Sequence, residues 1–151
     1  MSVFVAEELS EVLNTKVVIG RINMGLSNRI IIDDVLLDDQ SGQEMLKVTR
    51  LSAKFDIMPF FKGKISISSV QLFGFNINLR KETPDSPPNF KFVLDAFASK
   101  DTVKKENSLD LRINSILIRR GRMSYHVLSE EETPGKFNAK HIQLQNIIAN
   151  I

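Results

Sequence analysis

Few side chains in this sequence are of the types that usually carry out chemistry. The chain has two histidines, His126 and His141, and no cysteine. Imidazoles bind transition metals and transfer protons, but these two fall on different predicted strands. His141 has no carboxylate two or four residues away, and Glu130, four residues after His126, falls in a stretch expected to be a charged hairpin tip, so neither histidine is assigned a metal partner. We interpret them as separate strand or surface histidines, and the sequence predicts no catalytic residue, no metal ligand, no cofactor and no enzyme activity.

Other clusters of polar side chains lack the order of a known site. Four aspartates within residues 33–39 flank a predicted turn, but their spacing differs from that of a calcium loop, so solvated turn carboxylates are favoured. The serines of residues 66–69 have no histidine nearby in sequence, and no glycine-rich phosphate loop is present. Arg119, Arg120 and Arg122 would suit anionic lipid headgroups, although positive charge guarding a strand edge is the preferred alternative.

The composition is that of an ordinary folded domain. Of 151 residues, 42% are apolar and 25% are charged, and the formal net charge is +2. Such a chain can bury one core, while its dispersed charges lack the dense positive stripe that nucleic-acid binding requires. No apolar run is long enough for a signal peptide or a spanning helix. We expect residues 1–151 to form a single β-rich domain and, because the chain stops inside a predicted strand, to be a fragment of a longer protein.

Two short helices must be fitted among the expected strands. Residues 3–14 place apolar side chains on one helical face, and Asn14 is a suitable stop. A second helix is expected near residues 89–98, where Asn89 occupies the position of a cap and is followed by an aromatic stripe. The sequence therefore predicts a mostly β fold of the α+β type.

The expected strands fall into two blocks. The first covers residues 16–80, with Gly74 as a bend or turn, and the second covers residues 109–151. Residues 82–108 lie between them and are expected to hold a proline-rich loop, the second helix and a mobile linker. We expect the blocks to form a curved antiparallel sheet or groove.

One apolar pattern recurs six times in these blocks, with apolar residues at positions i, i+2, i+5 and i+7 around a polar pair. Because successive strand residues point to opposite faces, the two halves of each copy share a face only if the polar pair shifts the phase by one residue. Either the pair forms a β-bulge and bends the strand, or each half is buried on a different face. The copies are Val17/Ile19/Ile22/Met24, Ile30/Ile32/Val35/Leu37, Leu46/Val48/Leu51/Ala53, Ile65/Ile67/Val70/Leu72, Leu111/Ile113/Ile116/Ile118 and Ile142/Leu144/Ile147/Ala149.

Three segments carry a resemblance to a known family. Residues 5–39 place an amphipathic helix directly before a V-x-I-G-x-I strand, residues 59–79 contain the block P-F-F-K-G-K-I-x-I-x-x-V-x-L, and residues 89–97 read NFKFVLDAF, an aromatic helix led by asparagine. Together these features resemble the N-terminal region of bacterial AsmA-like and TamB-like envelope proteins, especially those of Bacteroidetes.

The resemblance implies a function without catalysis. Proteins of this family are anchored to the inner membrane by an N-terminal helix, and their periplasmic β-strands form an elongated apolar groove. They are linked to outer-membrane assembly and to phospholipid movement between the two membranes, and they are similar to eukaryotic bridge-like lipid-transfer proteins. The resemblance therefore implies a periplasmic segment whose anchor lies just upstream, with phospholipid acyl chains and outer-membrane assembly components as partners.

The groove would act by keeping acyl chains out of water, which costs about 0.8 kcal/mol per exposed methylene. The alternative is an envelope scaffold or protein-interaction domain, in which the same strand residues form a closed core. The candidate groove residues are Ile65, Ile67, Val70, Leu72, Ile77, Leu79, Leu111, Ile113, Ile116 and Ile118.

Overall fold

The computed structural model describes residues 2–56, 66–101 and 112–151 and has the expected mostly β fold. Helix α1 spans Ser2–Leu13 and helix α3 spans Lys91–Asp101. The strands are β1 (Val17–Gly25), β2 (Arg29–Asp38), β3 (Glu44–Asp56), β4 (Ser66–Lys81), β5 (Arg112–Ile113), β6 (Ile116–Val127) and β7 (His141–Asn150).

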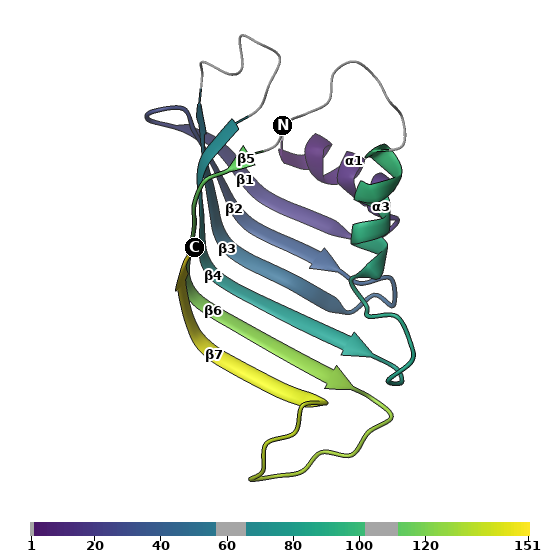
Figure 1. Ribbon diagram of the computed structural model, residues 1–151. Coiled ribbons are helices and arrows are strands. Elements are labelled where there is room, and N and C mark those ends of the chain that lie inside the picture. The colour runs from purple at the N-terminus through teal and green to yellow at the C-terminus, as the bar shows by residue number, and fades with distance from the viewer. Residues whose placement is uncertain (1, 57–65, 102–111) are drawn as a thin grey trace.

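The described strands form one sheet in the order β1-β2-β3-β4-β6-β7, with the short β5 beside β4 (Figure 1). Most neighbours are antiparallel, as expected, but β4 runs parallel to both β5 and β6. A parallel pair needs a long crossover connection, and here the segment that contains α3 provides it. The sheet is therefore mixed and largely antiparallel, and the expected antiparallel sheet is confirmed except where β4 pairs with β5 and β6.

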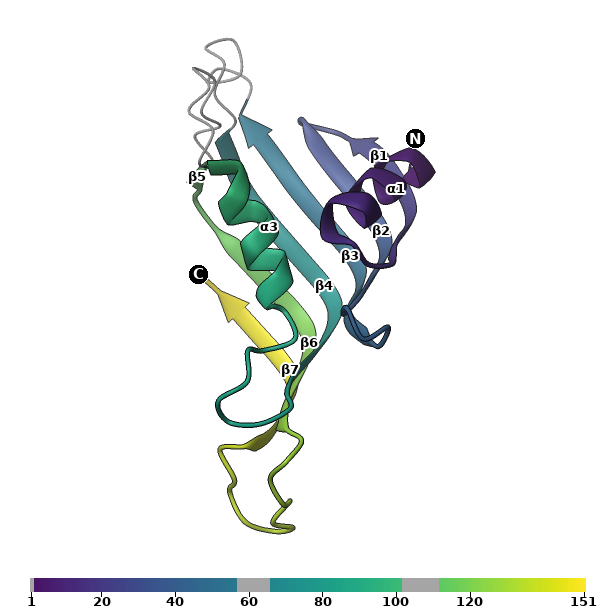
Figure 2. The same ribbon diagram turned by 90° about the vertical axis from the view of Figure 1, so that its right-hand side faces the viewer.

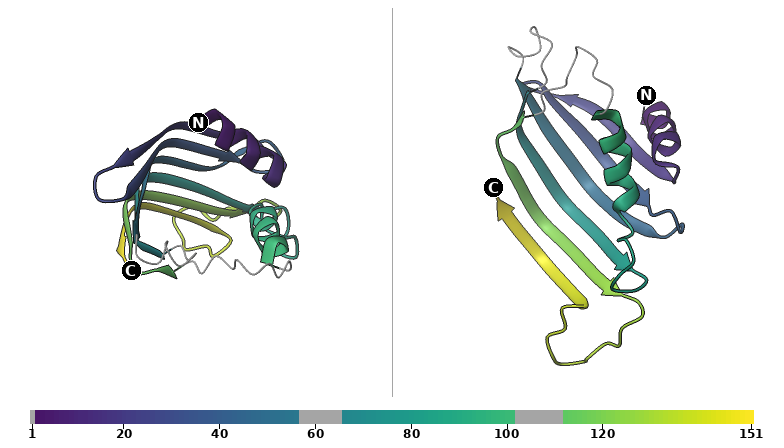
Figure 3. Two further views of the ribbon diagram at one scale, coloured as in Figure 1. Left: turned by 90° about the horizontal axis from the view of Figure 1, so that it is seen from above. Right: turned by 45° about the vertical axis from the view of Figure 1, so that its right-hand side comes forward.

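The strands bend along a line that crosses the whole sheet (Figures 1 and 3). At this line the residue pairing between neighbouring strands skips a position or shifts register. Four of the residues there have a positive φ angle: Asp34 (56°), Gly74 (64°), Arg120 (53°) and Asn146 (55°). The bend line consists of Gly20, Asp34, Thr49, Gly74, Arg120 and Asn146.

Two glycines on or beside the bend line are required because neighbouring strands approach closely there. Gly74 combines a positive φ with a near contact: a Cβ atom there would lie 2.7 Å from the Thr49 hydroxyl. A Cβ atom on Gly121, next to the line in β6, would lie 2.3 Å from the ring of Phe75. The predicted bend at Gly74 is thus confirmed, and space as well as backbone conformation explains its residue type.

The bulge interpretation of the repeated pattern holds in the strands where packing tests it. In β1, Val17, Ile19 and Ile22 all belong to or pack against one hydrophobic cluster, although simple alternation would place Ile22 on the opposite face. In β2, Ile32 and Leu37 meet the same cluster across Asp34. The phase shift at the bend line therefore keeps both halves of each strand on one side, which we call the inner face.

The polar pairs of β4 and of the β5–β6 segment mark a second irregularity. The pairing of β3 with β4 shifts register opposite Ser68, and the break between β5 and β6 falls at Asn114 and Ser115. The Ser115 backbone carbonyl accepts a hydrogen bond from the Val70 amide at 2.9 Å. All six predicted pairs therefore coincide with a local break in the ladder, while β4 and β6 bend again at Gly74 and Arg120.

Both helices lie against the inner face, beside one another (Figure 2). Ala6 and Leu13 of α1 are buried against β1 and β2, and Phe92 and Val93 of the α3 segment complete the cluster. As expected, α1 ends at Asn14, whose φ of 49° is the left-handed conformation that closes many helices. No helix among the described residues is long and apolar enough to cross a membrane.

The predicted helix cap at Asn89 is wrong. The Asn89 side-chain oxygen accepts a hydrogen bond from the backbone amide of Arg80 at 2.9 Å, and its Nδ2 donates to the carbonyl of Asn78 at 2.9 Å. This side chain thus joins the end of β4 instead of the first turn of α3. Residues 102–108 of the predicted mobile linker lie outside the described residues, and residues 91–101 belong to α3.

Candidate functional site

The inner face brings together most of the predicted groove residues as rows that run from strand to strand. Val70 lies opposite Ile116 in the parallel β4–β6 pair, and Leu72 lies opposite Ile118. Residues in register point to the same side of a sheet, so each pair extends a continuous apolar row. Leu51 of β3 continues the second row on the other side of Leu72.

Further rows follow beyond the bend line. Ile77 lies opposite Met123, and Leu79 lies opposite Tyr125. Leu144 of β7 is paired with Met123 and carries this surface to the edge strand. Met123 and Tyr125 were not among the predicted groove residues, because the copy of the repeated pattern in this segment ends at Ile118. The sequence signal that indicates both residues is the alternation of large apolar or aromatic and polar side chains after Gly121 in β6.

These rows are not covered as a closed core would be. Every described candidate is half-buried or exposed, and 44% of the surface of Ile113 is accessible. Ile65 and Leu111 lie outside the described residues. No large side chain among the described residues is completely buried, and the buried apolar residues concentrate near α1 and β1–β3: Ala6, Leu13, Val17, Ile19, Leu37, Met45, Val48 and Ala53, with Phe75 and Val127 elsewhere.

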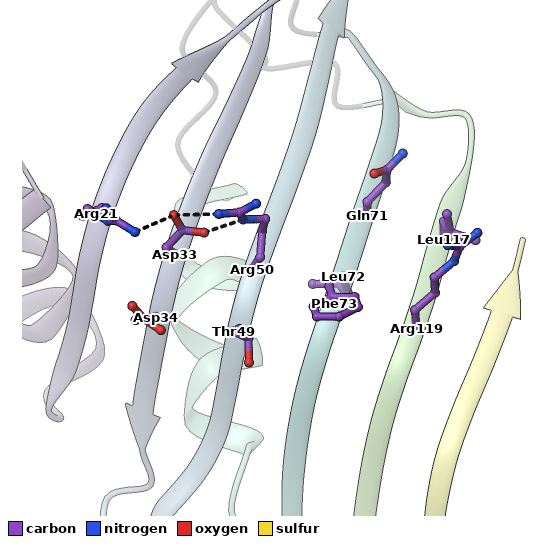
Figure 4. A pocket seen from close by; sticks show the side chains of 10 residues that line it. All are labelled: Arg21, Asp33, Asp34, Thr49, Arg50, Gln71, Leu72, Phe73, Leu117 and Arg119. Atoms are coloured by element: carbon purple, nitrogen blue, oxygen red, sulfur yellow. Dashed lines mark hydrogen bonds and ion pairs between the residues drawn. The ribbon is translucent and has the colours of Figure 1, made fainter.

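The opposite face of the sheet, here called the reverse face, carries a charged ladder at the bend (Figure 4). Asp33 is buried and accepts hydrogen bonds from Arg50 at 2.6 and 3.2 Å, while Arg21 lies 3.6 Å away on the other side. The hydrogen bond from Arg50 lowers the pKa of Asp33, against the opposing effect of burial. At this position the predicted solvated turn carboxylate is therefore a buried carboxylate that pairs with two exposed arginines.

A hollow of about 620 Å³ lies over this ladder and extends toward β6. Its lining includes Phe73 and Arg119, which are partners in register between β4 and β6. The guanidinium of Arg120 lies 5.4 Å from the centre of the Phe73 ring, within reach of a cation–π contact. Two of the three arginines considered for lipid headgroups, Arg119 and Arg120, thus lie beside an aromatic side chain on the reverse face.

The serines of residues 66–69 tie two strands together. The Ser66 hydroxyl donates to the Asp56 carboxylate at 2.9 Å, and the Ser68 hydroxyl donates to the Lys54 carbonyl at 3.2 Å. Both bonds connect β4 to β3. Their hydroxyl protons are therefore engaged in holding the sheet at its second irregularity.

Asp39 is the centre of a polar cluster at the end of the first hairpin. Its carboxylate accepts hydrogen bonds from the Ser41 hydroxyl at 2.6 Å, the Gln43 amide at 3.1 Å and Asn89 Nδ2 at 3.2 Å. It also forms an ion pair with Arg80. Burial opposes the charge, but these donors prevail and lower the pKa of Asp39 to about 2. The cluster fastens the turn after β2 to the end of β4 and the approach to α3.

His126 and His141, predicted as separate histidines, are direct partners in the antiparallel β6–β7 pair. Their Nδ1 atoms are 2.9 Å apart. Glu132, from the loop between the two strands, has a carboxylate oxygen close to both rings, with all three ligand atoms within 4.8 Å of one another. Among the described residues, this is the one group of histidine and acidic side chains close enough to share a metal ion.

Comparison with models of protein families gives no match, and comparison with curated proteins gives none either. The resemblance to AsmA-like and TamB-like proteins therefore rests on residues 5–39, 59–79 and 89–97 alone.

Proposed function

We propose that the chain is a non-enzymatic periplasmic segment of an AsmA-like or TamB-like protein. Its inner face receives phospholipid acyl chains during lipid transfer or outer-membrane assembly. The observation that carries this proposal is the set of half-buried apolar rows across β4, β6 and β7. They lie on the inner face, where the helices pack, and Figure 3 shows that the sheet bends toward the helices. The resemblance in sequence points to the same function.

The mechanism is physical. An acyl segment of ten methylenes gains roughly 8 kcal/mol when it is fully withdrawn from water. A bent sheet with apolar rows supplies part of that gain along the whole path, so the barrier to moving lipid through an aqueous space falls. The bulges at the bend line are what place both halves of each strand on the lipid-facing side.

A second candidate is an envelope scaffold or protein-interaction domain. The cluster under α1 favours it, because there the inner face is closed by packed side chains such as Leu13 and Leu37. On the reverse face, the hollow beside Phe73 would then be the contact surface, since 41% of the Phe73 surface is accessible. In that case the apolar rows of β6 and β7 would be covered by protein, and lipid would have no place on them.

A matched pair of variants in β7 tests the lipid function. Leu144→Gln places an amide on the inner face, and Ile148→Gln places the same group on the reverse face. Both side chains are well exposed, at 44% and 76%, so neither change should alter folding stability by more than about 0.5 kcal/mol. We expect the wild type to bind a fluorescent phospholipid, Leu144→Gln to bind it about three- to tenfold more weakly, and Ile148→Gln to match the wild type.

Native mass spectrometry of the purified wild type provides an independent measurement. Co-purified phospholipid that is reduced in Leu144→Gln and retained in Ile148→Gln would support the proposal. A wild type that carries no lipid and binds none in the fluorescence titration would refute it and favour the scaffold. Equal losses in the two variants would also refute the assignment of lipid to the inner face.

A further inference from the structure

The histidine pair lies at the loop end of the β6–β7 hairpin, and its geometry is not required by the proposed lipid function. His126 and His141 are held opposite one another by the strand ladder, and the Val127 amide donates to the Lys140 carbonyl at 2.9 Å beside them. Their ring centres are 5.2 Å apart, and the rings are tilted by 46°. The backbone therefore fixes where both rings lie.

The hydrogen bonds of His141 determine which of its nitrogen atoms is free. Its Nε2 lies 2.8 Å from the backbone carbonyl of Glu130, and a carbonyl can only accept, so Nε2 carries a proton. In the neutral ring Nδ1 is then a lone-pair donor directed at His126. A carbonyl that orients the far side of a ligating histidine is the usual supporting contact in metal sites.

The third group comes from the connecting loop. Glu132 lines a hollow of about 260 Å³ together with both histidines and Lys136. The loop is anchored on either side, since Lys140 pairs with Glu130 at 2.8 Å and Asn138 Nδ2 donates to the Glu131 carbonyl at 3.1 Å. The carboxylate thus approaches the imidazole pair from a loop held at both ends.

We propose that His126, His141 and Glu132 bind a divalent transition-metal ion of the Zn²⁺ type. Zinc takes imidazole nitrogen and carboxylate oxygen at about 2.0–2.2 Å, in tetrahedral sites that keep a fourth position for water. Two nitrogens at these distances are separated by roughly 3.4 Å in tetrahedral geometry. The Nδ1 atoms, at 2.9 Å, need to part only slightly. Nitrogen ligands disfavour Mg²⁺ and Ca²⁺, which prefer all-oxygen sites.

Metal binding replaces one hydrogen bond by two coordinate bonds. In the metal-free neutral pair, His126 donates its Nδ1 proton to His141 Nδ1. On binding, that proton leaves Nδ1, solvent protonates Nε2 of the same ring, and both Nδ1 lone pairs then face the ion. The net number of bound protons is unchanged. The site lies in the β6–β7 hairpin and does not depend on the proposed lipid function.

Zinc titration by calorimetry tests the site, on protein from which any histidine tag has been removed. His126 and His141 are the only histidines and cysteine is absent. We therefore expect one Zn²⁺ per chain, and a Co²⁺ complex without thiolate charge-transfer absorption. Replacing a direct ligand in His126→Gln, His141→Gln or Glu132→Gln should weaken binding at least about 10- to 100-fold, the loss that even outer-shell changes cause.

Glu131→Gln is the matched control, because it removes an adjacent carboxylate outside the cluster, and it should bind Zn²⁺ as the wild type does. Glu132 is exposed, so its variant folds even if a histidine variant does not. Zn²⁺ should also raise the melting temperature of the wild type and of Glu131→Gln but not that of Glu132→Gln. The proposal is overturned if the wild type takes up no stoichiometric Zn²⁺, or if Glu131→Gln and Glu132→Gln lose affinity equally.

Discussion

At the scale of single residues, Asp39 shows how a charge is kept inside a small domain. Only 3% of its surface is accessible, and backbone, hydroxyl, amide and guanidinium groups all donate to it. These contacts stabilise the ionised form more than burial opposes it, which is why its pKa falls to about 2. A depressed carboxyl pKa contributes to folding stability above the pKa of the unfolded chain, and that contribution disappears as the pH drops through the folded value.

Asp39→Asn should therefore reduce the free energy of unfolding at pH 6 and have a much smaller effect near pH 2. The drop in the Asp39 pKa from 3.8 to about 2 corresponds to a contribution of about 2 kcal/mol, present at pH 6 and lost between about pH 4 and pH 2. Urea unfolding at several pH values, followed by circular dichroism, measures the difference between wild type and variant. A difference that stays constant over this range would contradict the assignment.

Single residues differ in how well the sequence predicts their roles. Asn14 and Gly74 were predicted as a helix stop and a bend, because both roles depend on local backbone conformation. Asn89 was predicted as a helix cap and instead bonds to Arg80, and the contact between His126 and His141 was not predicted. These last roles depend on which distant segments become neighbours, and no local pattern contains that information.

At the scale of elements, each strand is two half-strands joined at a bulge. The apolar pattern located the polar pairs at which a strand either bulges or changes its buried face, because a phase shift of one residue is visible within a single strand. The pattern places no second bend in β4 or β6: the bend at Gly74 was predicted from the glycine alone, and the one at Arg120 was not predicted. Those positions line up with the bulges of other strands only after the sheet has formed.

Gly74→Ala should destabilise the protein more than Gly135→Ala does. Both glycines have a positive φ, at 64° and 76°, but a Cβ atom would meet the Thr49 hydroxyl at Gly74 and nothing within 4 Å at Gly135. The conformational penalty, about 1 kcal/mol, is common to both variants. The additional loss in Gly74→Ala measures the crowding between β3 and β4. Equal free energies of unfolding in denaturant would show that Thr49 moves aside without cost.

At the scale of the whole molecule, the two edges of the sheet differ in how much buried apolar core lies beside them. The helices and β1–β3 contain most of the buried apolar residues, whereas no residue of β7 is buried. Within the described residues, β1 and β7 form the two edges of the sheet, but only β1 is packed against a helix. The order of strands, with its parallel junction, was beyond sequence analysis because it depends on contacts between segments far apart in the chain.

Amide hydrogen exchange should reveal this imbalance. Amides of β7 that are bonded to β6 should exchange faster than those in the middle of β2, because the β7 side opens without exposing a packed core. Mass spectrometry of peptides after exchange at neutral pH gives the comparison. Uniform protection across the sheet would mean that it opens only as one cooperative unit.

The bend line also limits how the strands can slide past one another. In a regular sheet, a shift of two residues keeps every apolar side chain on its original face, so alternation alone does not prevent it. Here such a shift would set the Asp34 bulge against the regular part of β1 or β3 and break the alignment of the bends. The aligned bulges of the bend line therefore fix the register of neighbouring strands, in addition to giving the sheet its curvature.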